Sequence, residues 1–297
     1  MIVAKLPLRG AGGEPISFAR TIHSHGCAQL PPAEIVQETP LRYRRTLRVG
    51  GRIVDIVLSE HDGDVVAESD VRVGRRAATE IERIVARMFR MRDDLSPFYA
   101  SIEGDERLQW AAAGAGRMLA SPTIFEDVVK TICTTNCTWS STIRMTQALA
   151  ELGEGAFPEP ELLARTPTRW YASVAKMGYR GPYVKKIATD VVAGRLDLEV
   201  LGARTAYSDD EVEEALLALP GVGPYAAAHV MQMVGRHRRL VLDSWTRPTY
   251  VRLAQRRRAS DTTIRRAFAR YGDYAGLAFW LFLTRSWVEE PGPSELS

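Results

Sequence analysis

One acidic residue is a candidate for chemistry because of the residues around it. Asp243 is the single acid between residues 221 and 258, a stretch that carries the arginines Arg236, Arg238, Arg239, Arg247, Arg252, Arg256, Arg257 and Arg258. A carboxylate in this setting can act as a general base, or it can stabilise positive charge that develops on a reacting carbon. It can equally cap a helix that begins near Ser244, because aspartate is among the preferred N-cap residues.

The arginines indicate a surface that meets phosphate groups. The net charge of the whole chain is only +3, from 39 basic and 36 acidic residues, so the average says little about partners. A local excess of arginine is the electrostatic signature of a surface that contacts a nucleic acid backbone. The alternative is an arginine-rich face that contacts only solvent.

The segment before Asp243 predicts a hairpin between two helices. It reads LPGVGPYAAAHV over residues 219–230. Gly221 and Gly223 allow a positive φ or the close approach of another backbone, and Pro224 suits the first turn of the next helix. Backbone amides at such a helix N-terminus form a site for a phosphate oxygen. A tight turn without a ligand is the alternative.

The bulk composition is typical of a soluble globular protein. The chain has 297 residues, of which 45% are hydrophobic and 25% charged. The longest apolar run near the C-terminus, GLAFWLFL (276–283), is too short to span a bilayer, so we expect no membrane partner. Three cysteines are too few for a disulfide framework. We therefore expect a cytoplasmic protein, associated with the nucleoid if the source is bacterial.

The N-terminal part of the chain indicates strands and the rest indicates helices. β-branched runs broken by a glycine pair and an Asp-Gly turn predict the strands Thr46–Val49, Arg52–Leu58 and Asp64–Ser69. After about Gly74, apolar residues recur at helical spacing. We predict a mainly α protein of the α+β class, with a strand-rich domain over residues 1–78 and a helical core over residues 79–297.

Helices are predicted from apolar periodicity and from start and stop signals. They span Thr123–Cys133, Ser141–Leu152, Pro160–Ala164, Arg180–Ala193, Asp209–Leu219, Pro224–Val234, Thr262–Ala269 and Tyr274–Trp287. The start at Asp209 has the strongest signal, because Ser208 and Glu211 have the spacing of a capping box. The helix-hairpin-helix unit therefore covers residues 209–234.

Four segments together resemble one protein family. They are FEDVVKTICTTNCTW (125–139), MGYRGPYVKKIA (177–188), LPGVG (219–223) and LVLDSWTR (240–247). They resemble the helix-hairpin-helix (HhH-GPD) DNA glycosylases, in the branch that acts on 8-oxoguanine and on 3-methyladenine and other alkylated bases. The resemblance covers most of the chain and implies a two-lobed helical core with an antiparallel sheet domain. It also implies a monomer whose partner is double-stranded DNA containing a damaged base.

The resemblance implies a catalytic role for Asp243. This residue has the position of the family's essential aspartate, which stabilises the sugar's oxocarbenium character as the N-glycosidic bond stretches. Some members form a Schiff base through a lysine two residues after the second hairpin glycine. Here that residue is Tyr225, which cannot form an imine. The resemblance therefore implies a monofunctional glycosylase of base excision repair that leaves an abasic site and has no AP-lyase activity.

The extruded base needs a pocket, and the resemblance places Tyr225 and His229 in it. Trp139 and Trp245 suit a cation–π contact with a positively charged base, although core packing is the alternative for His229 and both tryptophans. Alkylated purines such as 3-methyladenine are therefore the favoured substrates. One alternative is an 8-oxoguanine-type glycosylase, toward which ICTTN (132–136) points. The other is a non-catalytic HhH DNA-binding protein.

Further residues are expected to contact the DNA. By resemblance, Asn136 lies beside the orphaned opposite base and Tyr179 fills the gap left by the extruded one. Without the family, Asn136 would be a turn residue and Tyr179 a surface ring. The remaining predicted DNA contacts are the hairpin residues Gly221, Val222 and Gly223 and the basic residues Arg180 and Arg247.

No cofactor is expected to be required. No cysteine follows Cys137, which excludes the C-terminal iron-sulfur cluster of other branches of the family. By resemblance, the hairpin can bind a Na⁺, K⁺ or divalent ion through the carbonyls of Leu217, Leu219 and Val222. Pro248 predicts that the helix after Asp243 begins late or kinks.

Overall fold

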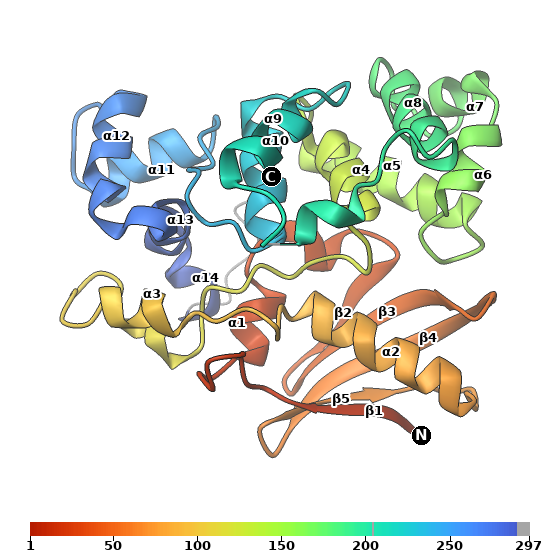
Figure 1. The fold of residues 1–297 in the computed structure, drawn as a ribbon, viewed down its shortest axis with the longest axis horizontal. Coiled ribbons are helices and arrows are strands. Elements are labelled where there is room, and N and C mark those ends of the chain that lie inside the picture. Colours follow the sequence, from red (N-terminus) through yellow and green to blue (C-terminus); the bar gives the residue numbers. More distant parts are fainter. Residues whose placement is uncertain (204, 290–297) are drawn as a thin grey trace.

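The computed structural model describes residues 1–203 and 205–289, so residues 290–297 of the predicted core lie outside the described part. Within that part, five strands form one antiparallel sheet in the order β1-β5-β4-β3-β2 (Figure 1). The strands are β1 (Ile2–Pro7), β2 (Ala33–Glu38), β3 (Leu41–Val49), β4 (Arg52–His61) and β5 (Asp64–Glu68).

The three predicted strands are confirmed as β3, β4 and β5, whereas β1 and β2 are absent from the prediction. Both additional strands lie at the edges of the sheet. Each buries a single residue, Ala4 in β1 and Ala33 in β2. Without alternating large apolar residues, an edge strand leaves no period-two signal in the sequence.

The helix α2 (Arg75–Met88) lies along the sheet and completes its hydrophobic core (Figure 1). Ile81 and Val85 of this helix belong to the same buried cluster as Ile56 and Leu58 of β4. The predicted domain boundary at residue 78 falls inside α2. The buried face of this helix packs with the sheet.

Helices form the rest of the described chain. They are α1 (Phe18–Ile22), α3 (Ser96–Ser101), α4 (Ile124–Thr134), α5 (Trp139–Leu152), α6 (Pro160–Arg165), α7 (Thr168–Ser173), α8 (Arg180–Val192), α9 (Asp209–Leu217), α10 (Pro224–Met233), α11 (Thr246–Leu253), α12 (Asp261–Phe268), α13 (Ala275–Thr284) and α14 (Ser286–Glu289). The 3-10 helices are η1 (Gly26–Gln29), η2 (Gln109–Ala113), η3 (Glu199–Gly202) and η4 (Ala269–Tyr274). No helix of the described residues has the length and apolar character needed to cross a membrane.

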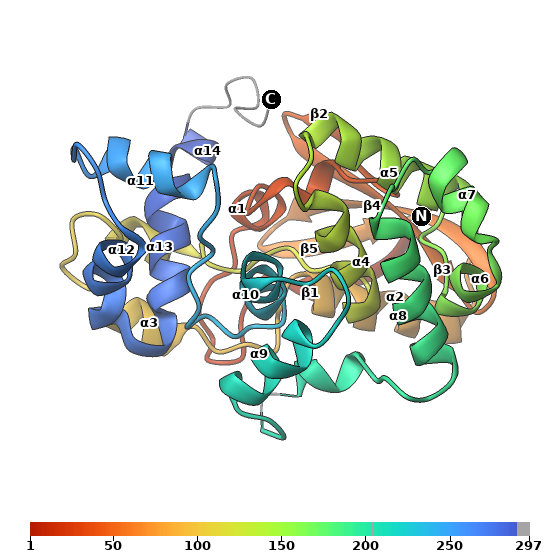
Figure 2. The ribbon, with the colours of Figure 1, turned by 90° about the horizontal axis from the view of Figure 1, so that it is seen from above.

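The helices form two lobes, as predicted. Figure 2 shows α11, α12 and α13 with α3 on one side and α4–α8 on the other, with α10 between them. One buried cluster joins α4, α5, α8, α9 and α10, and a second joins α3, α11, α12 and α13. The fold is therefore mainly α with an N-terminal antiparallel sheet, which confirms the predicted fold class.

Local signals predicted the helix boundaries near the hairpin well. The capping box at Ser208 and Glu211 is present, and α10 begins at Pro224 as expected. The predicted C-terminal helix is interrupted at Arg285, which separates α13 from α14. α10 buries Ala226, Ala227 and Ala228, whose small side chains let it pack closely against α4 and α9.

Candidate active site

A cavity of about 860 Å³ lies where the two lobes meet the N-terminal domain. Ten predicted site residues line it: Asn136, Trp139, Tyr179, Gly221, Gly223, Tyr225, His229, Asp243, Trp245 and Arg247. Predicted residues outside its lining are Arg180, Val222, Leu217 and Leu219. The volume suits a small organic ligand such as a nucleobase with part of its sugar.

Asp243 combines a structural contact with access to the cavity. Its Oδ1 accepts hydrogen bonds from the backbone N–H groups of Trp245 at 2.9 Å and Thr246 at 2.6 Å. The Thr246 hydroxyl oxygen in turn accepts from the Asp243 N–H at 2.8 Å. No donor among the described residues reaches Oδ2. The carboxylate therefore holds the start of α11 with one oxygen and leaves the other for a ligand.

The helix after Asp243 starts two residues later than Ser244, and the predicted kink at Pro248 is absent. α11 begins at Thr246, so Pro248 lies in its first turn. A backbone N–H has no intrahelical partner at that position, so proline is tolerated there. The orientation of the Asp243 carboxylate is thus fixed by a regular helix start.

The hairpin uses its two glycines differently. Gly221 has φ +84°, and a Cβ placed there would lie 2.7 Å from the Tyr183 ring, so both conformation and space require glycine. Gly223 has a negative φ and nothing within 4 Å of its virtual Cβ. Its surface is open to the backbone of a partner. The Val222 side chain is buried, so only its backbone can contribute to a contact.

Tyr225 and His229 lie one above the other on the cavity side of α10. Their rings stack with centroids 5.9 Å apart, and the Tyr225 hydroxyl lies 3.4 Å from the Thr134 hydroxyl. Burial raises the pKa of Tyr225. Burial also lowers the pKa of His229 to about 4, against the opposing charge of Asp243. Both rings are therefore neutral near pH 7.

Aromatic rings from distant parts of the chain complete the cavity. Trp245 lies 5.9 Å from Trp280 and 5.4 Å from Trp287, measured between ring centroids. Trp280 and Trp287 are absent from the predicted site. Trp280 lies in the apolar run GLAFWLFL (276–283), which indicates core packing, and no motif marks Trp287. Only a single position within that run faces the cavity, and no local pattern marks it.

A second missed wall comes from the N-terminal domain. His25 and Gly26 line the cavity, and the Gly26 backbone supports Trp139. A Cβ at Gly26 would lie 2.4 Å from the Trp139 ring, so this position requires glycine. The Trp280 N–H donates to the Ser24 carbonyl at 2.8 Å, which joins α13 to the same segment. No sequence motif marks these residues.

Asn136 and Tyr179 meet at the cavity mouth. The Asn136 side-chain amide donates to the Tyr179 hydroxyl at 3.4 Å, and Tyr179 is 51% exposed. Arg180 is buried and donates to the backbone carbonyls of Thr135 and Asn136. Its guanidinium therefore fixes the loop that carries Asn136. The predicted DNA contact would require a guanidinium that faces solvent, and this one does not.

The arginine stretch divides into paired and exposed residues. Arg236 pairs with Asp209 at 2.8 Å, and Arg239 pairs with Asp210 and Glu213 of the same helix, α9. At the cavity Arg247 pairs with Asp261 at 2.8 Å. The exposed members are Arg238, Arg252, Arg256, Arg257 and Arg258. The sequence overstated the positive charge because its window excluded the acids of α9.

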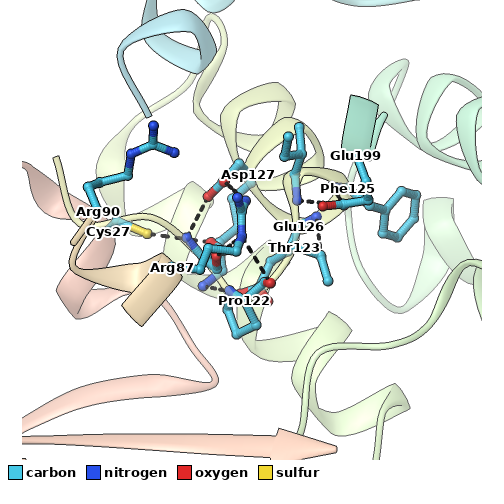
Figure 3. A network of polar contacts seen from close by, with 12 residues as sticks. Cys27, Arg87, Arg90, Pro122, Thr123, Phe125, Glu126, Asp127 and Glu199 are labelled. Carbon is cyan, nitrogen blue, oxygen red and sulfur yellow. Dashed lines mark hydrogen bonds and ion pairs between the residues drawn. The ribbon is translucent and has the colours of Figure 1, made fainter. Parts of the chain in front are cut away.

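The α4 wall of the cavity is anchored by a buried polar network (Figure 3). Asp127 pairs with Arg87 at 2.9 Å and accepts from the Ser121 N–H, and burial raises the pKa of Asp127 to about 6. Glu126 pairs with Arg45 of β3 and with Lys130. Because Arg45 comes from the sheet, this network ties the N-terminal domain to the cavity.

The predicted ion site at the hairpin rests on backbone carbonyls. The Leu219 carbonyl accepts the Val222 N–H at 3.2 Å, which closes the turn and leaves it one lone pair. Leu217 ends α9. Among the described residues, no group of three or more histidine, cysteine, aspartate or glutamate side chains could hold a metal. The carbonyl site stays a prediction.

No protein-family model and no curated protein matches the chain. Solved structures do. A 3-methyladenine DNA glycosylase from Archaeoglobus fulgidus has a TM-score of 0.72 at 19% identity, covering 95% of this chain and 98% of that one. A Clostridium acetobutylicum 8-oxoguanine glycosylase/lyase has a TM-score of 0.69 at 19% identity, covering 92% and 94%. A Schizosaccharomyces pombe 3-methyladenine DNA glycosylase has a TM-score of 0.52 at 15% identity, covering 65% and 97%. The chain therefore has the fold of the helix-hairpin-helix DNA glycosylases.

Proposed function

We propose that the protein is a monofunctional DNA glycosylase that acts as a monomer on double-stranded DNA. A damaged base would enter the cavity, and hydrolysis of its N-glycosidic bond would leave an abasic site. The observation that carries this proposal is the Asp243 carboxylate, which lines the cavity with one oxygen fixed by two N–H groups. The hairpin beside it presents open backbone at Gly223 for a phosphate.

The chemistry follows from where positive charge develops. As the N-glycosidic bond stretches, the sugar acquires oxocarbenium character, and a nearby carboxylate stabilises it. The second carboxylate oxygen of Asp243 is available for this role, and it can also accept a proton from an attacking water. Tyr225 and His229 beside it are neutral, so neither ring forms an ion pair with the carboxylate.

We propose that the enzyme has no lyase activity, because no free amine lies among the described residues that line the cavity. Lyase activity through a Schiff base needs a free amine at the sugar carbon. Tyr225 replaces the lysine at the family's nucleophile position. Among the described lining residues the one lysine is Lys130, whose ammonium pairs with Glu126 at 2.8 Å and donates to the Leu30 carbonyl at 3.1 Å. It is therefore not free to attack.

Alkylated purines are the proposed substrates. The cavity contains the electron-rich rings of Trp139, Tyr225, Trp245, Trp280 and Trp287. Such rings attract a cationic base through cation–π contacts. The likeness in fold to an 8-oxoguanine glycosylase/lyase keeps oxidised purines as the second candidate.

The test uses purified protein on duplexes that carry single alkylated, oxidised or deaminated bases. We expect release of at least one alkylated purine, an abasic site that breaks only after alkali, and no covalent complex on borohydride treatment. Asp243→Asn should lower the rate of release by about 10²–10³-fold or more and keep DNA binding, while Asp210→Asn on α9 serves as the matched control. A trapped complex would contradict the monofunctional mechanism. DNA binding without any base release would favour the non-catalytic alternative.

A further inference from the structure

Three ring nitrogens at the cavity are buried without a hydrogen-bond partner among the described residues. They are His25 Nε2, Trp139 Nε1 and His229 Nδ1. All three residues line the same cavity. Burying a polar atom without a hydrogen-bond partner is unfavourable, so most such atoms in native structures have one. Because all three lie at one cavity, they indicate a ligand that forms hydrogen bonds with them.

The Ser24 hydroxyl is the hydrogen-bond partner of one nitrogen of His25. The Ser24 hydroxyl oxygen accepts the Leu119 N–H at 2.9 Å and lies 3.0 Å from His25 Nδ1. A serine hydroxyl has one proton and two lone pairs, so it can donate to Nδ1 while it accepts from Leu119. A neutral imidazole whose Nδ1 accepts carries its proton on Nε2. In that arrangement, His25 presents to the cavity an Nε2–H donor that has no partner among the described residues, and the residue is only 6% exposed.

The neighbouring rings extend this polar edge. The His229 ring centroid lies 5.2 Å from that of His25. Burial, together with His229 and Lys130, lowers the pKa of His25 well below its usual value, so both imidazoles are neutral near pH 7. The Trp139 indole contributes a second N–H donor, and its ring packs against Gly26, the residue after His25.

On the basis of the proposed glycosylase function, we propose that His25, Trp139 and His229 form a subsite that reads the edge of the extruded base. Two N–H donors select bases whose buried edge presents acceptors, a carbonyl oxygen or an unprotonated ring nitrogen. The aromatic walls contact the faces of any base, so the edge supplies the discrimination. Because the histidine rings are neutral, they do not repel a cationic alkylated purine. Such a purine still has a carbonyl oxygen or an unprotonated ring nitrogen as acceptor.

The experiment separates hydrogen bonding from packing. His25→Phe and Trp139→Phe keep a ring and remove the N–H donor, whereas His25→Gln keeps an N–H donor. We expect both Phe variants to lose about tenfold or more in kcat/KM for the released base, as the loss of a buried hydrogen bond implies. His25→Gln should recover to within about threefold of wild type. All variants should bind a duplex with a tetrahydrofuran abasic site within about twofold of wild type.

Two matched variants lie outside the cavity lining, His23→Gln in the same segment and Trp170→Phe in α7. They should keep wild-type kcat/KM, and thermal melts of every variant report folding. The subsite is overturned if His25→Phe keeps wild-type kcat/KM, or if His25→Gln falls as far as His25→Phe. Failure of the wild type to release any base is a different result, because it would reject the proposed function itself.

Discussion

The cavity has two walls of different character. The hairpin wall, residues 221–247, offers open backbone, a carboxylate and an arginine close to solvent. The N-terminal wall consists of His25–Cys27, together with Trp280 of α13. It offers buried rings and Gly26, where a larger side chain would clash with Trp139. In the proposed enzyme, the hairpin wall binds DNA and supplies the catalytic carboxylate, whereas the N-terminal wall determines which base binds.

The largest effect is expected at the chemical residue of the hairpin wall. Asp243→Asn should lower kcat by about 10²–10³-fold or more, because the charge that stabilises the oxocarbenium ion is lost. Asparagine keeps an oxygen for the N–H groups of Trp245 and Thr246, so unfolding stability should change little. Single-turnover base release and chemical denaturation measure the two quantities.

Asp243→Ala separates the catalytic role of the carboxylate from its hydrogen bonds to the backbone. It should be as inactive as Asp243→Asn and should also lose about 1 kcal/mol of stability, because it removes the Oδ1 hydrogen bonds to the backbone N–H groups of Trp245 and Thr246. Equal stability of the two variants would show that the Oδ1 hydrogen bonds contribute nothing. Base release undiminished in Asp243→Asn would remove the chemical role from the hairpin wall.

The two walls meet at the His25–His229 pair, which predicts a pH dependence of stability. The folded-state pKa of His229 is lowered to about 4 from 6.5, so the folded protein binds fewer protons than the unfolded chain between these values. The contribution of neutral His229 to the free energy of unfolding is therefore fully present above pH 6.5. It is lost as the pH falls toward 4. The loss from His229 is about 3 kcal/mol, and His25 adds to it in the same direction.

Urea denaturation between pH 7 and 4 measures this loss. His229→Gln should flatten the profile, and Asp243→Asn should steepen it, because the Asp243 carboxylate favours protonated His229. His61→Gln, which changes an exposed histidine, is the control. An unchanged profile in His229→Gln would mean that this ring is not held neutral by burial.

The difference between the walls also explains what the sequence could predict. The hairpin, the capping box and the hydrogen bonds of Asp243 to the start of α11 depend on contacts within four residues, and local spacing indicated all three. The N-terminal wall depends on contacts such as Trp280 to Ser24, which join residues 256 positions apart. The same limit applies to Arg239, whose acidic partners lie on α9, on the far side of the hairpin in sequence. Short-range hydrogen bonds leave a pattern in one sequence, whereas packing across the fold does not.

Gly26→Ala tests the N-terminal wall by adding one methyl group. The new Cβ would lie 2.4 Å from the Trp139 ring, so the indole must move. We expect about tenfold lower kcat/KM and a stability loss of about 1–3 kcal/mol, the usual range for overpacking. Binding to abasic-site DNA should be kept. Gly74→Ala is the matched control, because its Cβ meets nothing within 4 Å. Wild-type kcat/KM in Gly26→Ala would show that Trp139 adapts without consequence.

The smallest effects are expected from arginines beside the hairpin wall, where paired and exposed residues should behave differently. Arg257→Gln and Arg258→Gln change exposed side chains, so stability should stay constant while DNA binding weakens. If each contacts one phosphate, the slope of log K against log salt should decrease by about one per residue. Arg239→Gln instead breaks ion pairs to α9, at a cost of up to about 1 kcal/mol of stability, with a smaller change in salt slope. A larger change in salt slope for Arg239→Gln than for Arg257→Gln would reverse this division, and the exposed arginines would then lie away from the DNA.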